Sequence, residues 1–383
     1  MSLNSSNAVR TFVRRTAQVT TLVASAAVGF PVAAAHSGTT HAGTPHWLLL
    51  LFVITGLGVL GLSSMGVRRA WVVGRVGIVG VFLGGLLAMF GGIGLVEIQV
   101  VAPAGPSRGF YRWYPLASLF IGSITLVGSF VIVRLRWPDR PRYAMLGGLL
   151  GAWISYPVVL PNNGVTNPIG YLLVLSVVLL TGYIIRHDAK PLLSRLRTSR
   201  LVSGVGVLSG VLFMIFFAFS AGTLSTNPDA GIGMPETRTI TTVMLADPLV
   251  SWPAVEFYFP SIPLSGFVSV GTVLLFGFIG SLVGLNAAFV ANQWERASDT
   301  GSSSVFAGSL AASGATACCC CAPAMYGVVS AVMGVAASPI YWAFMDPTSP
   351  VGGTFFAVSV LLLTSSLVRS ADEIACEPRR SID

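Results

Sequence analysis

Nine long apolar runs follow one another along this chain, and their length limits its fold more than any other feature. Most are about 18 to 25 residues long, the length that a helix needs to cross a hydrocarbon core of about 30 Å. In lipid every backbone amide must be paired within its own segment, so such runs are helices rather than open strands. Hydrophobic residues make up 54% of the chain and charged residues only 9%. We therefore expect an all-α fold, a polytopic integral membrane helix bundle of about nine transmembrane helices. The runs span 47–64, 77–100, 114–133, 143–160, 168–185, 202–224, 264–289, 302–337 and 354–368.

The first 35 residues have the pattern of a secretory signal segment. Arg10, Arg14 and Arg15 precede an apolar stretch that ends in three alanines at 33–35. A basic start, an apolar middle and an A-x-A end are typical of a signal peptide, and an uncleaved signal anchor is the alternative. The predicted organisation is a signal segment at 1–35, an extracytoplasmic histidine-bearing tether at 36–46, a transmembrane bundle at 47–369 with an extracytoplasmic loop at 225–263, and a cytoplasmic tail at 370–383.

The basic residues flank the apolar runs, and this distribution predicts the orientation of the chain. If the mature N-terminus is outside, only Arg108, Arg112 and Arg238 fall in outer loops. Such a bias is the positive-inside pattern of a plasma-membrane protein with a cytoplasmic C-terminus. The net charge of +8 is thereby explained without a nucleic-acid partner. The predicted inner residues are Arg68, Arg69, Arg75, Arg134, Arg136, Arg140, Arg142, Arg186, Lys190, Arg195, Arg197, Arg200, Arg296, Arg369, Arg379 and Arg380.

The run at 302–337 is too long for one upright helix. We expect one helix that is broken near Cys318–Pro323, because proline lacks an amide and clashes with the preceding turn. A re-entrant half-helix followed by a crossing, or two full crossings, are the alternatives. The charge pattern favours a single net crossing, since two would place the C-terminal arginines outside.

Four of the five cysteines stand in a row, as Cys318, Cys319, Cys320 and Cys321. On a regular helix successive residues lie about 100° apart, so the four thiols cannot form one cage, but Cys318 and Cys321 share a face. A break at Pro323 would let more of them converge. Thiolates select soft ions such as Cu(I), while neutral cysteines can also pack as small hydrophobic residues. The run resembles the thiol pairs of mercury- and copper-handling membrane proteins, over these few residues only.

Three of the four histidines lie close together on the predicted outer tether, at His36, His41 and His46. Cleavage after residue 35 would make His36 the N-terminus, where its free amine and imidazole form a chelating pair for Cu(II). The alternative is a polar linker with solvated histidines. The sequence therefore offers a second set of candidate metal ligands, distant from the cysteines along the chain.

These features predict a protein that handles a soft metal ion, with copper as the expected ion. A permease and a membrane-anchored metal chaperone fit equally well. A membrane thiol–disulfide redox protein and a non-catalytic subunit of a larger membrane complex are the alternatives. We predict no catalytic residue, and the expected partners are the lipid bilayer and a protein that donates or accepts the metal. The chain could also assemble with itself or with other subunits.

Two patterns predict how the helices pack. Pairs of glycines four residues apart let helix backbones approach closely in lipid. Asn286 lies deep in an apolar run, where an amide is expected to bond across helices. The glycine pairs are Gly80/Gly84, Gly147/Gly151, Gly206/Gly210 and Gly280/Gly284.

Overall fold

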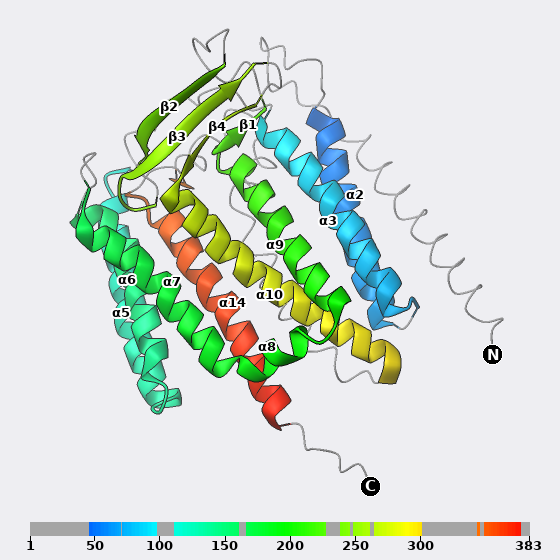
Figure 1. The fold of residues 1–383 in the computed structure, drawn as a ribbon. Helices are drawn as coiled ribbons and strands as arrows, with labels where there is room; N and C mark the ends of the chain where they lie inside the picture. The colour runs from blue at the N-terminus through cyan, green and yellow to red at the C-terminus, as the bar shows by residue number, and fades with distance from the viewer. Residues whose placement is uncertain are drawn as a thin grey trace, which may run out of the picture.

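The protein is a bundle of long helices with a small β-sheet at one end (Figure 1). This computed structural model describes residues 46–69, 71–97, 111–160, 166–226, 238–245, 248–260, 264–300, 343–344 and 348–376. The predicted signal segment, most of the histidine tether and the long run at 302–337 therefore lie outside the described residues.

Seven of the described helices are long and apolar enough to cross a membrane. An eighth predicted run, 143–160, forms the 19-residue helix α6, which is not one of the seven. The expectation of a multi-pass helical membrane protein is thus confirmed, with seven candidate spans in the described part of the chain. The helices are α2 (His46–Arg68), α3 (Gly74–Glu97), α5 (Tyr114–Arg136), α6 (Pro141–Val159), α7 (Pro168–Asp188), α8 (Lys190–Leu196), α9 (Arg200–Ser220), α10 (Val270–Thr300) and α14 (Pro350–Cys376).

Local sequence explains where several helices begin. Proline stands in the first turn of α5, α6, α7 and α8, where its missing amide would have no helical partner anyway. The side chain of Asn167 accepts a hydrogen bond from the amide of Ile169 at 3.0 Å and caps α7. Ser199 caps α9 in the same way, through the amide of Val202. Such caps satisfy amides that the first turn leaves unpaired.

The segments that carry most of the basic residues lie at the end of the bundle opposite the sheet (Figure 1). The α2–α3 and α5–α6 turns, the short helix α8 and the last turns of α10 and α14 all lie at this end. Every predicted inner basic residue that falls in the described ranges belongs to these segments or the helix ends beside them. Arg112 and Arg238, by contrast, precede α5 and β2 at the sheet end. The two sets of basic residues that the sequence assigns to opposite sides of the membrane therefore lie at opposite ends of the bundle.

Paired glycines form close helix contacts, as predicted. A Cβ atom added to Gly284 of α10 would lie 2.6 Å from the carbonyl oxygen of Gly206 in α9, and one added to Gly210 would lie 2.8 Å from that of Gly280. The same holds between α5 and α6, where a Cβ on Gly151 would meet the Gly122 oxygen at 2.6 Å. These helices approach to backbone contact, which any side chain at these positions would prevent.

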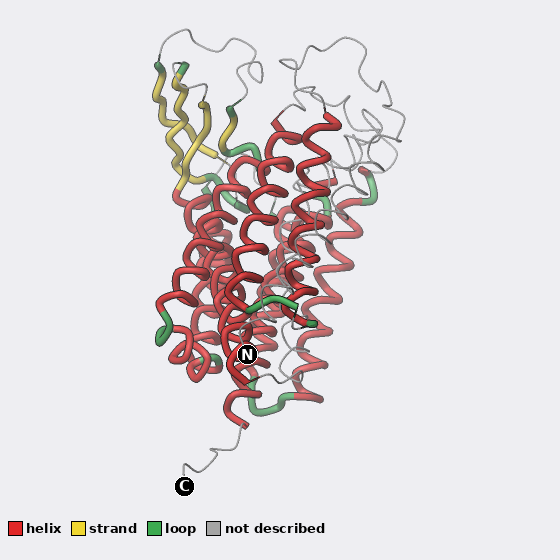
Figure 2. The backbone as a smooth tube through the Cα atoms, turned by 90° about the vertical axis from the view of Figure 1, so that its right-hand side faces the viewer, coloured by secondary structure: helices red, strands yellow, loops and turns green. Residues whose placement is uncertain are grey.

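The structure also contains a four-stranded β-sheet, which the predicted all-α fold did not include. Its strands are β1 (Leu224–Ser225), β2 (Thr239–Leu245), β3 (Trp252–Phe259) and β4 (Leu264–Ser269), antiparallel in the order β1-β4-β3-β2. Thus the apolar run predicted as one helix from 264 to 289 begins as β4 and becomes α10 only at Val270. Alternating β-branched and aromatic residues favour strands here, and Figure 2 shows the sheet standing on the helix ends.

Trp252 attaches the inner face of the sheet to the bundle. Its indole Nε1 donates to the carbonyl oxygen of Pro248 at 3.0 Å, and its ring packs edge-on against Tyr171 of α7 with centroids 4.6 Å apart. The Tyr171 hydroxyl in turn donates to the carbonyl oxygen of Ser251. Gly271 in the first turn of α10 lies against the same indole. The sheet is therefore held on the ends of α7 and α10.

Candidate functional site

Most of the predicted metal ligands fall outside the part of the chain that the structure describes. These are His36, His41 and the four cysteines Cys318, Cys319, Cys320 and Cys321. His46 is the first residue of α2, at the sheet end of the bundle. Within the described ranges, no group of three or more His, Cys, Asp or Glu residues is placed to hold a metal ion. The metal site therefore stays a prediction from the sequence.

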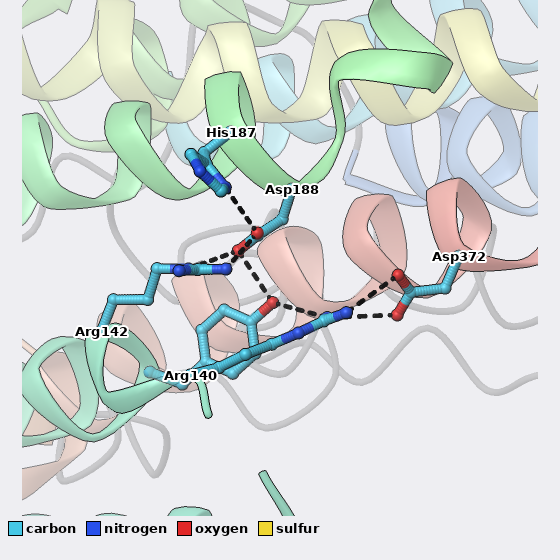
Figure 3. Close-up of polar contacts among 6 residues, drawn as sticks. Arg140, Arg142, His187, Asp188 and Asp372 are labelled. Carbon is cyan, nitrogen blue, oxygen red and sulfur yellow. Dashed lines mark hydrogen bonds and ion pairs between the residues drawn. The ribbon is translucent and has the colours of Figure 1, made fainter. Parts of the chain in front are cut away.

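The described residues do form a polar cluster (Figure 3), and the helix ends that carry it lie opposite the sheet in Figure 1. We call it the arginine network; its members are Arg140, Arg142, Tyr143, His187, Asp188 and Asp372. They come from the start of α6, the end of α7 and the last turns of α14. The network thus joins three helices that are distant in sequence.

Asp188 is the centre of the arginine network. It accepts from Nε of Arg142 at 2.8 Å and also from Nη2 of the same guanidinium, so the pair is bidentate. The Tyr143 hydroxyl donates to Oδ2 at 2.9 Å, and Nδ1 of His187 lies 3.1 Å from Oδ1. The Asp188 side chain is only 5% exposed and that of Arg142 20%. A carboxylate this buried is stable as an anion because these donors replace its water.

Arg140 extends the network to α14 through a more exposed pair. Its two terminal nitrogens each lie 3.3 Å from an oxygen of Asp372, and Nη1 also donates to the Tyr143 hydroxyl at 3.1 Å. The side chains of Arg140 and Asp372 are 33% and 52% exposed. Hydrogen bonds to Asp372, and then to Tyr143, raise the pKa of Arg140 above its ordinary value. The guanidinium therefore stays charged under all ordinary conditions.

The ion pairs and hydrogen bonds of the arginine network hold α6, α7 and α14 together at this end of the bundle. Both carboxylates are engaged by guanidinium groups, and the buried one has donors on both oxygens. Charge counting identified Arg140 and Arg142 as inner residues, but it gave no partner for either. Asp188 was missed because it lies 46 residues from Arg142, and sequence alone does not show that α6 and α7 bring them together.

A second polar position lies inside the bundle, between α10 and α14. Asn286 is fully buried, and its amide nitrogen donates to the carbonyl oxygens of Leu282 at 2.8 Å and Leu363 at 3.2 Å. The bond to Leu363 confirms the prediction that this amide bonds across helices. Among the described residues, Oδ1 of Asn286 and Oγ1 of the neighbouring buried Thr364 have no hydrogen-bond partner. These two buried oxygens could therefore each still accept a hydrogen bond.

An apolar groove lies where the sheet meets α10. It has a volume of about 680 Å³ and is shallow, more open than enclosed. Residues 242–244 of β2, 253–255 of β3, and 268–270 and 273–274 of the β4–α10 junction line it. Those described lining residues include no charged side chain. The sequence offered no indication of this groove, because it depends on the unpredicted sheet.

No family model, curated protein or solved structure matches this chain.

Proposed function

We propose that this chain is a multi-pass plasma-membrane protein that handles a soft metal ion, most simply copper. The observation that carries the proposal is the row Cys318–Cys321 followed by Pro323 inside an apolar run. Thiolates bind Cu(I) well, and a bound cation is the usual way to keep a thiolate charged in an apolar setting. The histidines His36, His41 and His46 would collect the ion on the outer side.

The arrangement of the neighbouring helices supports a path between the two sets of ligands. α2 begins at the sheet end with His46, so the histidine tether would enter the bundle there. α10 ends opposite the sheet, whereas α14 begins at the sheet end. The two long helices on either side of the cysteine-bearing run thus have their facing ends at opposite ends of the bundle, as a single net crossing by that run would require.

The orientation is part of the proposal. The basic end of the bundle would be cytoplasmic, which places the sheet and the histidines outside and the end of α14 inside. Copper would then move from the outer histidines toward the thiols, either through the membrane as in a permease or to an acceptor protein as in a chaperone.

Bound metal in the purified protein tests the proposal. The wild type would be purified from cells grown with copper and its metals measured, beside a variant with serine at 318–321 and another with alanine at 36, 41 and 46. We expect both variants to lose copper. The matched controls Cys376→Ser and His187→Ala change the same residue types outside the proposed ligands and should retain it. A wild-type protein without bound metal would reject the proposal, and a mass gain of two hydrogens on reduction would favour the thiol-redox alternative.

A further inference from the structure

We propose that the apolar groove between the sheet and α10 binds the acyl chain of a membrane phospholipid. This inference is independent of metal handling, because none of the proposed metal ligands lines the groove. It rests on the arrangement of the sheet's outer face, on the position of the groove at the end of a membrane span, and on the chemistry of its walls.

One row of side chains crosses three strands to form the floor of the groove. Thr242 of β2 is paired with Val255 of β3, and Val255 is paired with Val268 of β4, so the three share one face of the sheet. Val255 is 43% exposed and Val268 45%. Met244 stands at the side of this row, 55% exposed. Soluble proteins rarely leave such a set of large apolar side chains uncovered unless something binds there.

The floor continues without interruption onto a helix surface that faces lipid. Val270 follows Val268 by two residues and is the first residue of the candidate span Val270–Glu295. Val273, one turn later, lies on the same side of α10, and the two are 60% and 58% exposed. An acyl chain lying along these first turns would therefore reach the sheet without leaving apolar surroundings.

Two hydroxyl side chains line the groove, those of Thr242 and Ser269, and that of Ser269 is already engaged within the protein. The Ser269 hydroxyl donates to Oγ1 of Thr272 at 3.1 Å, and the Thr272 hydroxyl donates to the carbonyl oxygen of Ser269 at 2.9 Å. A polar or charged ligand would find few partners here, whereas a hydrocarbon chain needs none. A volume of about 680 Å³ lies within the range of sites for small ligands.

Two other occupants would give different results. β2 is at the edge of the sheet as far as the described residues show, so an extended peptide could pair with it. A second copy of this chain could also cover the same face. Both would place protein, rather than lipid, against Val255. The test must therefore report the chemical nature of the neighbour.

Photo-crosslinking in native-like bilayers makes that distinction. The full chain would be reconstituted with a phosphatidylcholine that carries a diazirine in one acyl chain, irradiated and mapped by mass spectrometry. We expect peptides that contain 242–244, 253–255 and 268–274 to be labelled several-fold more than the lipid-exposed surface of α9 around Val207, which is 69% exposed. Val255→Trp should fill the groove and reduce its labelling to the level of α9, whereas the control Val207→Trp should leave it unchanged.

Even if Val255→Trp does not fold, the labelling map of the wild-type protein tests the proposal. Labelling that is no greater in the groove than on α9 overturns it. Protein–protein adducts from a benzophenone amino acid at position 255 would overturn it in favour of a peptide or a second copy.

Discussion

Arg142 and Asp188 form a bidentate ion pair that fixes the start of α6 to the end of α7. Replacing Asp188 by Asn leaves the guanidinium largely buried without its counter-ion, and breaking a buried pair in this way costs about 3 kcal/mol or more. We therefore expect Asp188→Asn to lower the unfolding temperature in detergent markedly. The control is Asp372→Asn, which removes an exposed pair worth less than about 1 kcal/mol. Equal losses in the two variants would contradict the role of burial.

The amide of Asn286 links α10 to α14 inside the bundle. Asn286→Ala removes its bond to the Leu363 carbonyl, and such interhelical bonds contribute about 0.6 kcal/mol on average and up to about 1.7 kcal/mol. We expect a modest loss of stability in detergent or bilayers. Ser281→Ala on the same helix is the control, because in the described part of the chain the exposed Ser281 hydroxyl bonds within α10, to Gly277. A loss of the same size in both variants would argue that the interhelical bond contributes nothing.

Two glycines of α10 should respond in opposite directions to the same substitution. Gly284→Ala places a methyl group 2.6 Å from the Gly206 oxygen, which should separate α9 from α10 and cost about 1 to 3 kcal/mol. Nothing lies within 4 Å of a Cβ at Gly277, so Gly277→Ala should be neutral or stabilise the helix by up to about 1 kcal/mol. Thermal unfolding of the two variants in the same detergent measures the contrast, and a stable Gly284→Ala protein would show that α9 and α10 are not in backbone contact.

The cysteines should not contribute equally to copper binding. On a helix that runs into Pro323, Cys318 and Cys321 share a face, while Cys319 and Cys320 point elsewhere. We expect Cys318→Ser/Cys321→Ser to lose more bound copper than Cys319→Ser/Cys320→Ser, measured on protein purified in parallel. Equal losses would mean that all four thiols converge on the ion.

The two ends of the bundle should be accessible from opposite sides of the membrane. With the native cysteines replaced by serine, Thr241→Cys in β2, an exposed position outside the groove, should react with an impermeant maleimide on intact cells. Ser194→Cys in α8 should react only after permeabilisation, because α8 belongs to the basic end of the bundle. Labelling of both from outside, or the reverse pattern, would overturn the proposed orientation.

Many of the helices could be predicted from sequence because in lipid the length of an apolar run is enough to predict a helix. A long apolar run must pair its own amides, so the runs at 47–64 and 168–185 correspond closely to α2 and α7. The glycine pairs and Asn286 were predictable for a related reason: lipid offers no competing partner to a small or polar residue, so it faces another helix.

The sheet and the arginine network could not be predicted in the same way. Hydropathy is continuous from β4 into α10, so the apolar pattern does not mark the change from strand to helix at Val270. Charge counting assigns a residue to one side of the membrane but does not choose its partner, and Asp372 is 232 residues from Arg140. The predicted metal ligands lie almost entirely outside the described residues, so they stay a prediction.

Because Asp372 lies 232 residues after Arg140 in the sequence, their ion pair can form only late in the synthesis of the chain. At about 5 to 20 residues per second, Arg140 waits on the order of tens of seconds for its counter-ion to be synthesised. Its helix α6 packs meanwhile with α5 and α7, but α14, which contacts α5, α6, α7, α8 and α10, is still absent. A chain arrested before residue 350 thus lacks the helix that closes the bundle. The Arg140–Asp372 ion pair therefore forms only after α14 has been synthesised, so it distinguishes molecules that contain α14 from those that end before it.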